Sequence, residues 1–242
     1  MGAVPVSGED VISTVFFDAG ETLLGPQPSW SGLSTTVLQS RGHDVTVEGL
    51  QTAWRHTAQV FLTNADEGRT FSTSHDESHR FWTNLYTDLL EYLGVQDPEA
   101  PEELYRTFSD PSNYDLFPDA VPTLDDLSGR GVRLGVISNF ESWLRVMLDR
   151  LGITDRFEVL AVSGDVGWEK PDPRIFKWAM EEAGAEPHEC LHVGDSPHFD
   201  AIPATELGMR GVLIDRYGRW DDVEGDFARV SSLRDVAALV AD

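Results

Sequence analysis

Several features that define other protein classes are scarce or absent in this sequence. Cys190 is the only cysteine among 242 residues, which excludes an intrachain disulfide and best fits a cytoplasmic protein. No run of about 18 apolar residues occurs, so a transmembrane helix is excluded. Residues 1–10 have neither the basic nor the apolar region of a signal peptide, and we expect none there.

Positive charge is also scarce. The 42 acidic residues outnumber the 18 basic ones and give a formal net charge of −24. Because such a surface repels nucleic acid and anionic membranes, we expect neither as a partner. Lysine occurs only at Lys170 and Lys177. This composition is typical of salt-adapted proteins, in which salt screens the self-repulsion; a genome that favours arginine is the alternative explanation.

Residues 25–113 carry a helical pattern throughout. Apolar residues recur at spacings of three and four, and turn-rich pieces such as 64–68 separate the helical segments. We predict helices over residues 31–39, 47–62, 75–93 and 101–108. The pattern therefore indicates an α-helical unit.

The rest of the chain alternates between short apolar runs and amphipathic segments. We predict strands over 11–17, 133–138, 157–163, 190–194 and 211–215, and helices over 121–127, 141–151, 174–183 and 200–207. A closing strand and helix are expected after Tyr217. This alternation predicts an α/β fold with a doubly wound, Rossmann-like parallel sheet. Residues 1–24 and 114–242 would form this core, and 25–113 an inserted α-helical cap.

Polar residues follow four of the predicted strands. Ligands of such sheets bind beyond the carboxyl ends of the strands. Asp18 follows the first run, Ser138 and Asn139 the second, Lys170 the third and Asp195 the fourth. Each residue alone has an ordinary explanation as a helix cap, turn or surface residue. Together they place an acid, a hydroxyl, a cation and a second acid on one sheet edge, which predicts a catalytic site.

Four segments carry a resemblance to a known family. The chain resembles the haloacid dehalogenase (HAD) superfamily of hydrolases, subfamily I with an α-helical cap, in VFFDAGETLL, LGVISNF, GWEKPDPRIF and LHVGDSPHFDA. The match covers 11–216 in the family's order. It implies that Asp18 is the nucleophile, which in phosphatase members forms an aspartyl-phosphate. It also implies that Ser138, Asn139 and Lys170 bind the phosphoryl group, with Lys170 neutralising its charge.

The resemblance further implies a magnesium site. Asp18, the backbone carbonyl of Gly20 and Asp195 match the family's ligands of Mg²⁺, a hard cation that prefers oxygen. Asp200 and Thr22 match residues that support this site. Because Mg²⁺ prefers oxygen, His198 is not expected to bind the metal, although it lies near Asp195. His192 belongs to a predicted strand and is expected to pack in the core.

Gly20 departs from the family pattern. Phosphatases of the family carry an aspartate there, which protonates the leaving group and then activates water. General acid–base assistance of this kind is worth about 10²–10⁴-fold in rate. Glu21 is the nearest substitute by sequence, although an ordinary turn residue is the competing interpretation. The cap histidines His56, His75 and His79 are further candidates, with surface positions as their competing interpretation.

Other members of the family also lack this aspartate. Dehalogenases attack carbon without a metal, but they place an aromatic residue at the position of Gly20. Their fourth motif also lacks the Gly-Asp pair that carries the metal-binding acid and that this chain keeps as Gly194-Asp195. Phosphonoacetaldehyde hydrolases use a cap lysine, and residues 25–113 contain none. Three hypotheses remain: a Mg²⁺-dependent phosphatase acting on a small phosphorylated metabolite, a weak or inactive relative that binds a phosphorylated ligand or a protein partner, and a 2-haloacid dehalogenase.

The cap sequence leaves the substrate undetermined. Its aromatic residues can either line a pocket or pack the cap, and their helical spacing favours packing. They are Trp54, Phe61, Phe71, Phe81, Trp82 and Tyr86.

Overall fold

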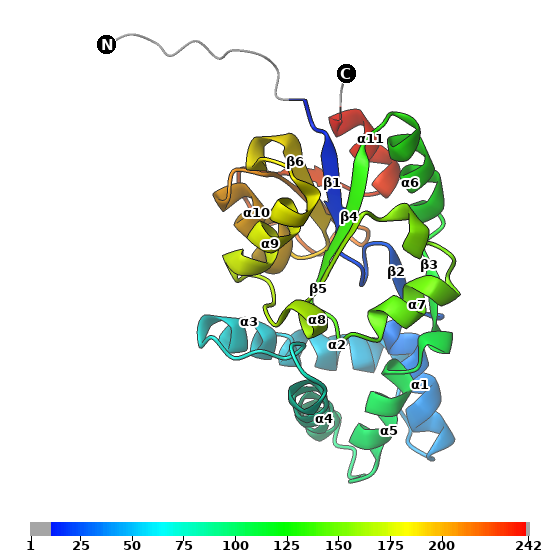
Figure 1. Cartoon of the computed structure of the whole chain (residues 1–242). Coiled ribbons are helices and arrows are strands. Elements are labelled where there is room, and N and C mark those ends of the chain that lie inside the picture. Colours follow the sequence, from blue (N-terminus) through cyan, green and yellow to red (C-terminus); the bar gives the residue numbers. More distant parts are fainter. Residues whose placement is uncertain (1–10, 241–242) are drawn as a thin grey trace.

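The computed structural model describes residues 11–240, except for the side chains of 64–66. The expectation about a signal peptide therefore lies outside the described residues. Figure 1 shows an α/β part that contains the large sheet and a helical part beneath it. Strand β1 (Thr14–Phe17) starts at the end of the sheet where α11 (Val236–Leu239) lies, and it runs toward the helical part. No helix in the described part of the chain is long and apolar enough to cross a membrane.

The main sheet contains six parallel strands in the order β5-β4-β1-β6-β7-β8. The remaining bounds are β4 Arg133–Ser138, β5 Val159–Val162, β6 Cys190–Gly194, β7 Arg210–Ile214 and β8 Ala228–Val230. Strand β1 pairs on both sides, with Phe17 opposite Val136 of β4 and Val193 of β6. The predicted α/β fold with a parallel, doubly wound sheet is thus confirmed.

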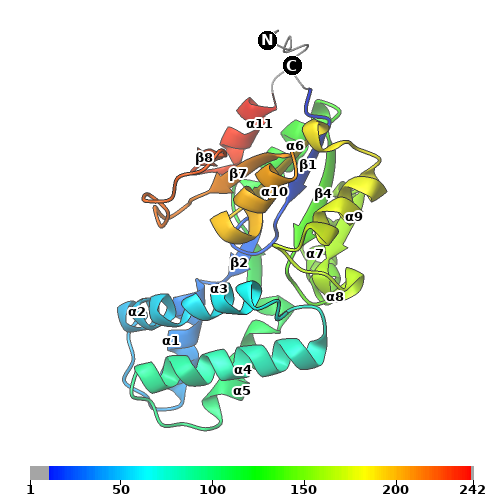
Figure 2. The ribbon, with the colours of Figure 1, turned by 90° about the vertical axis from the view of Figure 1, so that its left-hand side faces the viewer.

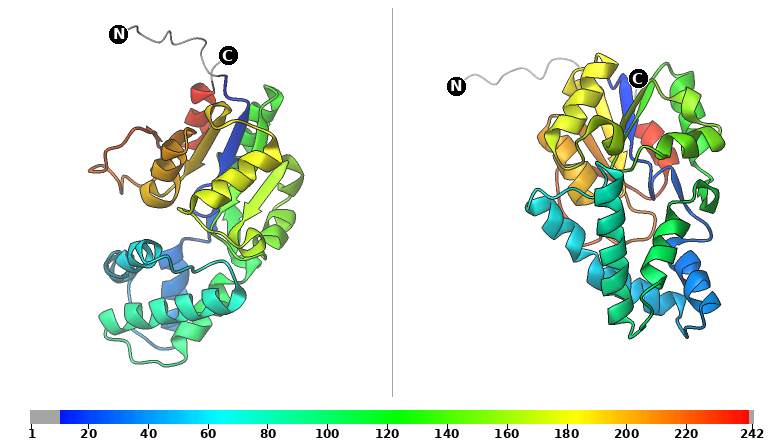
Figure 3. Two further views of the ribbon diagram at one scale, coloured as in Figure 1. Left: turned by 60° about the vertical axis from the view of Figure 1, so that its left-hand side comes forward. Right: turned by 60° about the horizontal axis from the view of Figure 1, so that its bottom comes forward.

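Side chains of β1 alternate between the two faces of the sheet. Val15 and Phe17 belong to one apolar cluster, and Phe16 belongs to the other. The first cluster includes α6 (Ala120–Gly129), α7 (Leu144–Arg150) and α11, and the second includes α9 (Pro173–Ala183) and α10 (Ile202–Glu206). Both faces are covered, which explains why all four residues of β1 are buried and why three of them, all but Thr14, are apolar. Figure 3 shows the helices on either side of the sheet.

The helical part contains α1 Trp30–Ser40, α2 Val47–Thr57, α3 Gln59–Asp66, α4 His75–Tyr92 and α5 Ala100–Phe108. Leu38, Leu50, Leu89 and Leu104 are fully buried in a cluster of its own. The single helix predicted over 47–62 is wrong, because the chain divides at Ala58. There the Phe61 N–H donates to the carbonyl of Ala58 only three residues back. The Thr57 hydroxyl also donates to two backbone carbonyls of α2, which competes with regular helix bonding.

Several boundaries in the α/β part differ from the predicted ones. Strand β1 begins three residues late, and Ser163 begins the short helix α8 (Ser163–Val166) instead of ending a strand. Helix α7 also begins late, after a turn at 141–143. The helix predicted over 200–207 starts as a π-helical turn over Pro197–Ala201, before α10. The closing strand and helix are present as β8 and α11.

A two-stranded ribbon lies where the chain passes between the two parts. Strand β2 (Leu24–Pro26) pairs antiparallel with β3 (Tyr114–Leu116), so the outgoing and returning segments are hydrogen-bonded to each other. Figure 2 shows this connection above helices α1–α5, which lie beyond the carboxyl ends of the strands. The sequence pattern did not reveal the ribbon. The boundaries at 24/25 and 113/114 stay a prediction.

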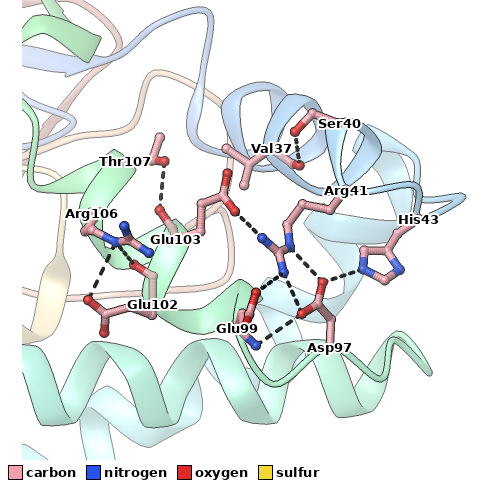
Figure 4. Close-up of polar contacts among 10 residues, drawn as sticks. All are labelled: Val37, Ser40, Arg41, His43, Asp97, Glu99, Glu102, Glu103, Arg106 and Thr107. Carbon is pink, nitrogen blue, oxygen red and sulfur yellow. Dashed lines mark hydrogen bonds and ion pairs between the residues drawn. The ribbon is translucent and has the colours of Figure 1, made fainter.

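An ion-pair cluster joins two loops of the helical part (Figure 4). Arg41, at the end of α1, contacts both carboxylate oxygens of Asp97, at 2.7 and 2.8 Å, and also pairs with Glu103 of α5. His43 Nε2 lies 2.9 Å from Asp97 Oδ2. The α1–α2 loop is thereby tied to the α4–α5 loop. The hydrogen bond from Arg41 is the main reason why the pKa of Asp97 lies well below its ordinary value.

Asp97→Asn is expected to lower the melting temperature at neutral pH. A carboxyl whose pKa is lowered by folding stabilises the native state above the unfolded-state pKa, and loses that effect as pH falls through the folded-state value. Circular dichroism melts should show a wild-type advantage that is constant above about pH 5 and shrinks below it. Asp88→Asn, at an exposed position on α4, is the control. A wild-type advantage that does not change with pH would contradict this explanation.

Candidate active site

The four predicted strand-end residues meet at the carboxyl edge of the sheet. Asp18 directly follows β1, and its Oδ1 accepts hydrogen bonds from Ser138 Oγ at 3.0 Å and Lys170 Nζ at 2.7 Å. Asp18 is 7% exposed and Lys170 only 2%. Ser138 and the fourth motif come from β4 and β6, the two neighbours of β1, while Lys170 reaches Asp18 from the loop after α8.

Lys170 lies between two carboxylates. Its ammonium also donates to Asp200 Oδ1, which in turn lies 2.9 Å from His192 Nε2. The Ser196 N–H donates to the other oxygen of Asp200 at 3.1 Å. Burial lowers the pKa of Lys170, but the charges of Asp18 and Asp200 outweigh it and the net shift is upward. The ammonium therefore stays charged.

Each carboxylate responds differently to this environment. Burial raises the pKa of Asp200, but the opposing effects of Lys170 and His192 bring it to about 2. The pKa of Asp18 is raised, mainly by burial and further by Asp200, while Lys170 opposes the shift. His192 is fully buried, as the sequence predicted, and burial lowers its pKa. Its contact with Asp200 was not predicted from the sequence.

The Asn139 side chain holds the backbone of Lys170. Its Oδ1 accepts from the Lys170 N–H at 2.6 Å, and its Nδ2 donates to the Lys170 carbonyl at 2.8 Å. The sequence analysis assigned Asn139 to phosphate binding, and that role stays a prediction. The observed contact instead fixes the loop from which Lys170 reaches Asp18.

Gly194 makes room for Asp200. A Cβ atom at Gly194 would lie 2.1 Å from the Asp200 carboxyl carbon, which no real contact allows. The glycine in the fourth motif therefore has a steric cause, since any side chain would displace the carboxylate that holds Lys170 and His192.

Three carboxylates form a cluster suited to a metal ion. Oxygens of Asp18, Asp195 and Asp200 all lie within 4.8 Å of one another. Burial, together with the nearby acids and despite Arg219, raises the pKa of Asp195 to about 8. A divalent cation would relieve this unfavourable concentration of acid, and all the donors are the hard oxygens that Mg²⁺ prefers. The cluster therefore fits a metal.

Backbone geometry near Asp18 is compatible with the predicted carbonyl ligand. The bridge between Gly20 and Leu24 uses the Ala19 carbonyl and the Glu21 N–H, so the Gly20 carbonyl takes no part in it.

Arg219 Nη2 lies 2.9 Å from Asp195 Oδ2, an ion pair that the sequence analysis did not foresee.

The turn after Asp18 contains an unusual backbone conformation. Glu21 has φ 55°, in the left-handed region that favours glycine, whereas Gly20 before it has an ordinary φ. A Cβ at Gly20 would meet nothing within 4 Å. Burial raises the pKa of Glu21, while Arg219 and Arg216 oppose the shift. The Glu21 carboxylate is thus partly buried, and it interacts electrostatically with Arg216 and Arg219.

Thr22 supports this turn from within the core. It is fully buried, and its carbonyl accepts from Arg216 Nη2 at 2.7 Å. The same guanidinium binds both carboxylate oxygens of Asp119, at 2.9 and 3.0 Å. Arg216 therefore links the turn after Asp18 to the chain returning from the helical part.

Known proteins resemble this chain along most of its length. A family model of haloacid dehalogenase-like hydrolases matches residues 12–208. The chain belongs to this family of hydrolases. "Haloacid dehalogenase-like hydrolase domain-containing protein 3" of Bos taurus is 31% identical over 82% of this chain and 80% of its own. "Phosphoserine phosphatase" of Thermus thermophilus is 30% identical over 92% and 96%.

A solved structure shows the same fold. The L-2-haloacid dehalogenase RSc1362 has a TM-score of 0.74 and 22% sequence identity, and the match covers 95% of this chain and 99% of that one. At this identity the likeness establishes the architecture of the HAD-like hydrolase and leaves the reaction open.

In this HAD-like hydrolase the cap histidines contact groups away from Asp18. His75 Nδ1 lies 3.0 Å from Glu141, His79 Nε2 lies 2.8 Å from Glu102, and His56 stacks on Tyr92. The predicted cap aromatics pack mainly on one another around Phe61, Phe71, Phe81 and Trp82. Phe71 also contacts Phe199 of the fourth motif, with ring centroids 6.1 Å apart.

Replacing Lys170 is expected to cost stability as well as activity. Lys170→Met leaves Asp18 and Asp200 buried without their cation, and breaking a buried pair from one side costs about 3–5 kcal/mol. Lys177→Met is the matched control, because Lys177 is exposed on α9. Urea unfolding should show a loss of this size only for Lys170→Met. Equal stabilities of the two variants would show that the buried ion pairs contribute no net stability.

Proposed function

We propose that this HAD-like hydrolase is a Mg²⁺-dependent phosphatase that acts on a small phosphate ester through an aspartyl-phosphate on Asp18. The observation that carries the proposal is the Asp18 carboxylate, whose Oδ1 is held by Ser138 and Lys170 beside the acid cluster. The resemblance to a phosphatase along nearly the whole chain supports this reaction class. That relative's name does not assign phosphoserine as the substrate here.

The proposed reaction has two displacements at phosphorus. Because Ser138 and Lys170 both contact Oδ1, we assign the attack to Oδ2 of Asp18, which forms an O–P bond as the bond to the leaving oxygen breaks. Water then attacks the aspartyl-phosphate, which releases inorganic phosphate and restores the carboxylate. Overall, one ester and one water give one alcohol and one phosphate.

Protein groups stabilise the charge that moves during these steps. In this proposal Lys170 and the Ser138 hydroxyl, which contact Asp18 Oδ1 in the structure, donate to the phosphoryl oxygens as they approach Asp18. Asp18, Asp195 and the Gly20 carbonyl would hold Mg²⁺, which supplies additional positive charge for binding the phosphate. Asp200 and His192 keep the lysine in place throughout.

The decisive assay uses a panel of phosphorylated metabolites with Mg²⁺, at low and at high salt. Asp18→Asn should abolish turnover while the melting temperature shows that the variant is folded, because the amide cannot act as the nucleophile. Phosphate binding without turnover on any substrate would favour the alternative, a phosphate-binding relative. Halide release from 2-haloacids without metal would instead establish dehalogenation.

Gly20 makes a specific prediction about proton transfer. Without an acid at this position, substrates with acidic leaving groups should be hydrolysed much faster than alkyl phosphates. Gly20→Asp has room for its Cβ and should raise the rate on alkyl phosphates by up to about 10²-fold, with little gain on aryl phosphates. Steady-state kinetics on matched aryl and alkyl esters would measure this. Gly20→Ala is the control for backbone effects.

A different outcome would assign the proton to Glu21. If Gly20→Asp gives no gain and Glu21→Gln selectively slows alkyl phosphates, Glu21 already supplies the proton. Its partly buried carboxyl has a raised pKa, as a general acid requires. If neither variant changes the preference for the leaving group, no protein acid at this turn assists the reaction.

A further inference from the structure

Two carboxylates of the α/β part are buried against the helical part. Glu169 is 7% exposed and Glu141 is 9% exposed, and neither belongs to the acid cluster around Asp18. Glu169 directly precedes Lys170 in the chain, whereas Glu141 lies in the turn before α7. Both accept hydrogen bonds across the interface between the two parts.

Glu169 binds the loop between α3 and α4. Its carboxylate accepts from the Phe71 N–H at 3.0 and 3.1 Å, from the Ser72 N–H at 2.9 Å and from Ser72 Oγ at 2.6 Å. The Ser72 hydroxyl also lies 2.7 Å from Ser163 Oγ at the start of α8. All four hydrogen bonds to Glu169 come from only two residues of one short cap segment.

Glu169 and Lys170 are neighbours in the chain, and each is held by a different segment. The cap segment binds the side chain of Glu169, while Asn139 binds the backbone N–H and carbonyl of Lys170. Lys170 must reach both Asp18 and Asp200 from this backbone. Displacement of Glu169 therefore changes the backbone from which the lysine side chain extends.

Because the Glu169 carboxylate is buried, the position in which Phe71 and Ser72 donate to it is favoured over others. A carboxylate removed from water needs its hydrogen-bond donors, and leaving them unmade costs more than a neutral bond would. Glu169 has these donors only while Phe71 and Ser72 are in place. When the segment leaves, water must enter to solvate the carboxylate beside Lys170.

We propose that Glu169 is a positioning residue that couples the seating of Phe71 and Ser72 to the placement of Lys170 against Asp18. The effect on catalysis rests on the proposed phosphatase function. The coupling itself does not, because hydrogen exchange can measure it without a substrate.

Glu141 provides a matched comparison. It accepts from Ser78 Oγ at 2.7 Å, from Tyr105 Oη at 3.1 Å and from His75 Nδ1 at 3.0 Å. Ser72 and Ser78 are thus both buried cap serines that donate to a buried core carboxylate. Only the partner of Ser72 is next to Lys170.

The experiment compares Ser72→Ala with Ser78→Ala in the full-length protein. Each variant loses one hydroxyl bond to a buried carboxylate, and Ser72→Ala also loses the contact with Ser163 Oγ, so Glu169→Gln tests the carboxylate apart from that contact. Ser72→Ala should speed amide exchange of residues 168–170 about tenfold, and lower kcat about tenfold with KM changed less than about twofold. Ser78→Ala should change neither by more than about twofold. Glu169→Gln should reproduce the effects of Ser72→Ala.

Two results would overturn the coupling. One is exchange at 168–170 that stays at the wild-type rate in Ser72→Ala, although exchange at 70–73 rises. The other is an equal rise in amide exchange at 168–170 in both serine variants, which would show general loosening of the interface. If no phosphate ester is turned over at all, the phosphatase proposal fails while the exchange comparison still decides the coupling.

Discussion

The contact of the Lys170 ammonium with Asp18 and Asp200 is the interaction on which the site depends. Three charged groups are nearly excluded from water, which is tolerable only when each is paired and hydrogen-bonded. The surrounding structure meets that requirement. His192 and Ser196 satisfy Asp200, Asn139 fixes the lysine backbone, and Gly194 leaves space for the second carboxylate. These groups come from β6 and from the segments that follow β1, β4, β5 and β6, and they meet at the carboxyl edge of the parallel sheet.

The turn after Asp18 shows a different balance. A non-glycine residue in the left-handed region costs about 1–2 kcal/mol, and this chain places Glu21 there while a glycine occupies the unstrained position before it. The side chains of Arg216 and Arg219 offset part of the cost of burying the Glu21 carboxylate. Strain of this kind persists only where the surroundings determine the conformation, and it is frequent at functional sites. The turn thus lacks a side chain at Gly20 and has a partly buried acid at the next residue.

The sequence predicted the fold and the placement of Asp18, Ser138 and Lys170 at one sheet edge, because both follow from local pattern and sheet topology. Buried strands read as apolar runs, and parallel strands bring their carboxyl ends to one edge. The missed features depend on how distant segments meet. Nothing local shows that Asn139 binds the Lys170 backbone, that Arg219 pairs with Asp195, or that β2 pairs with β3. The division of the predicted 47–62 helix at Ala58 was missed because periodicity continues through it.

The interface between the two parts has a chemical character that suits an acidic chain. Glu141 and Glu169 are the acceptors. Their partners at Phe71, Ser72, Ser78 and Tyr105 are backbone N–H or hydroxyl donors, and His75 is a basic partner of Glu141. Salt screens exposed charges far more than buried contacts. These hydrogen bonds therefore hold at high ionic strength, while the repulsion that follows from a net charge of −24 becomes weaker. Salt therefore weakens the contacts of Glu141 and Glu169 with the helical part little. Lys170 is buried in the site, where salt screens its charge least.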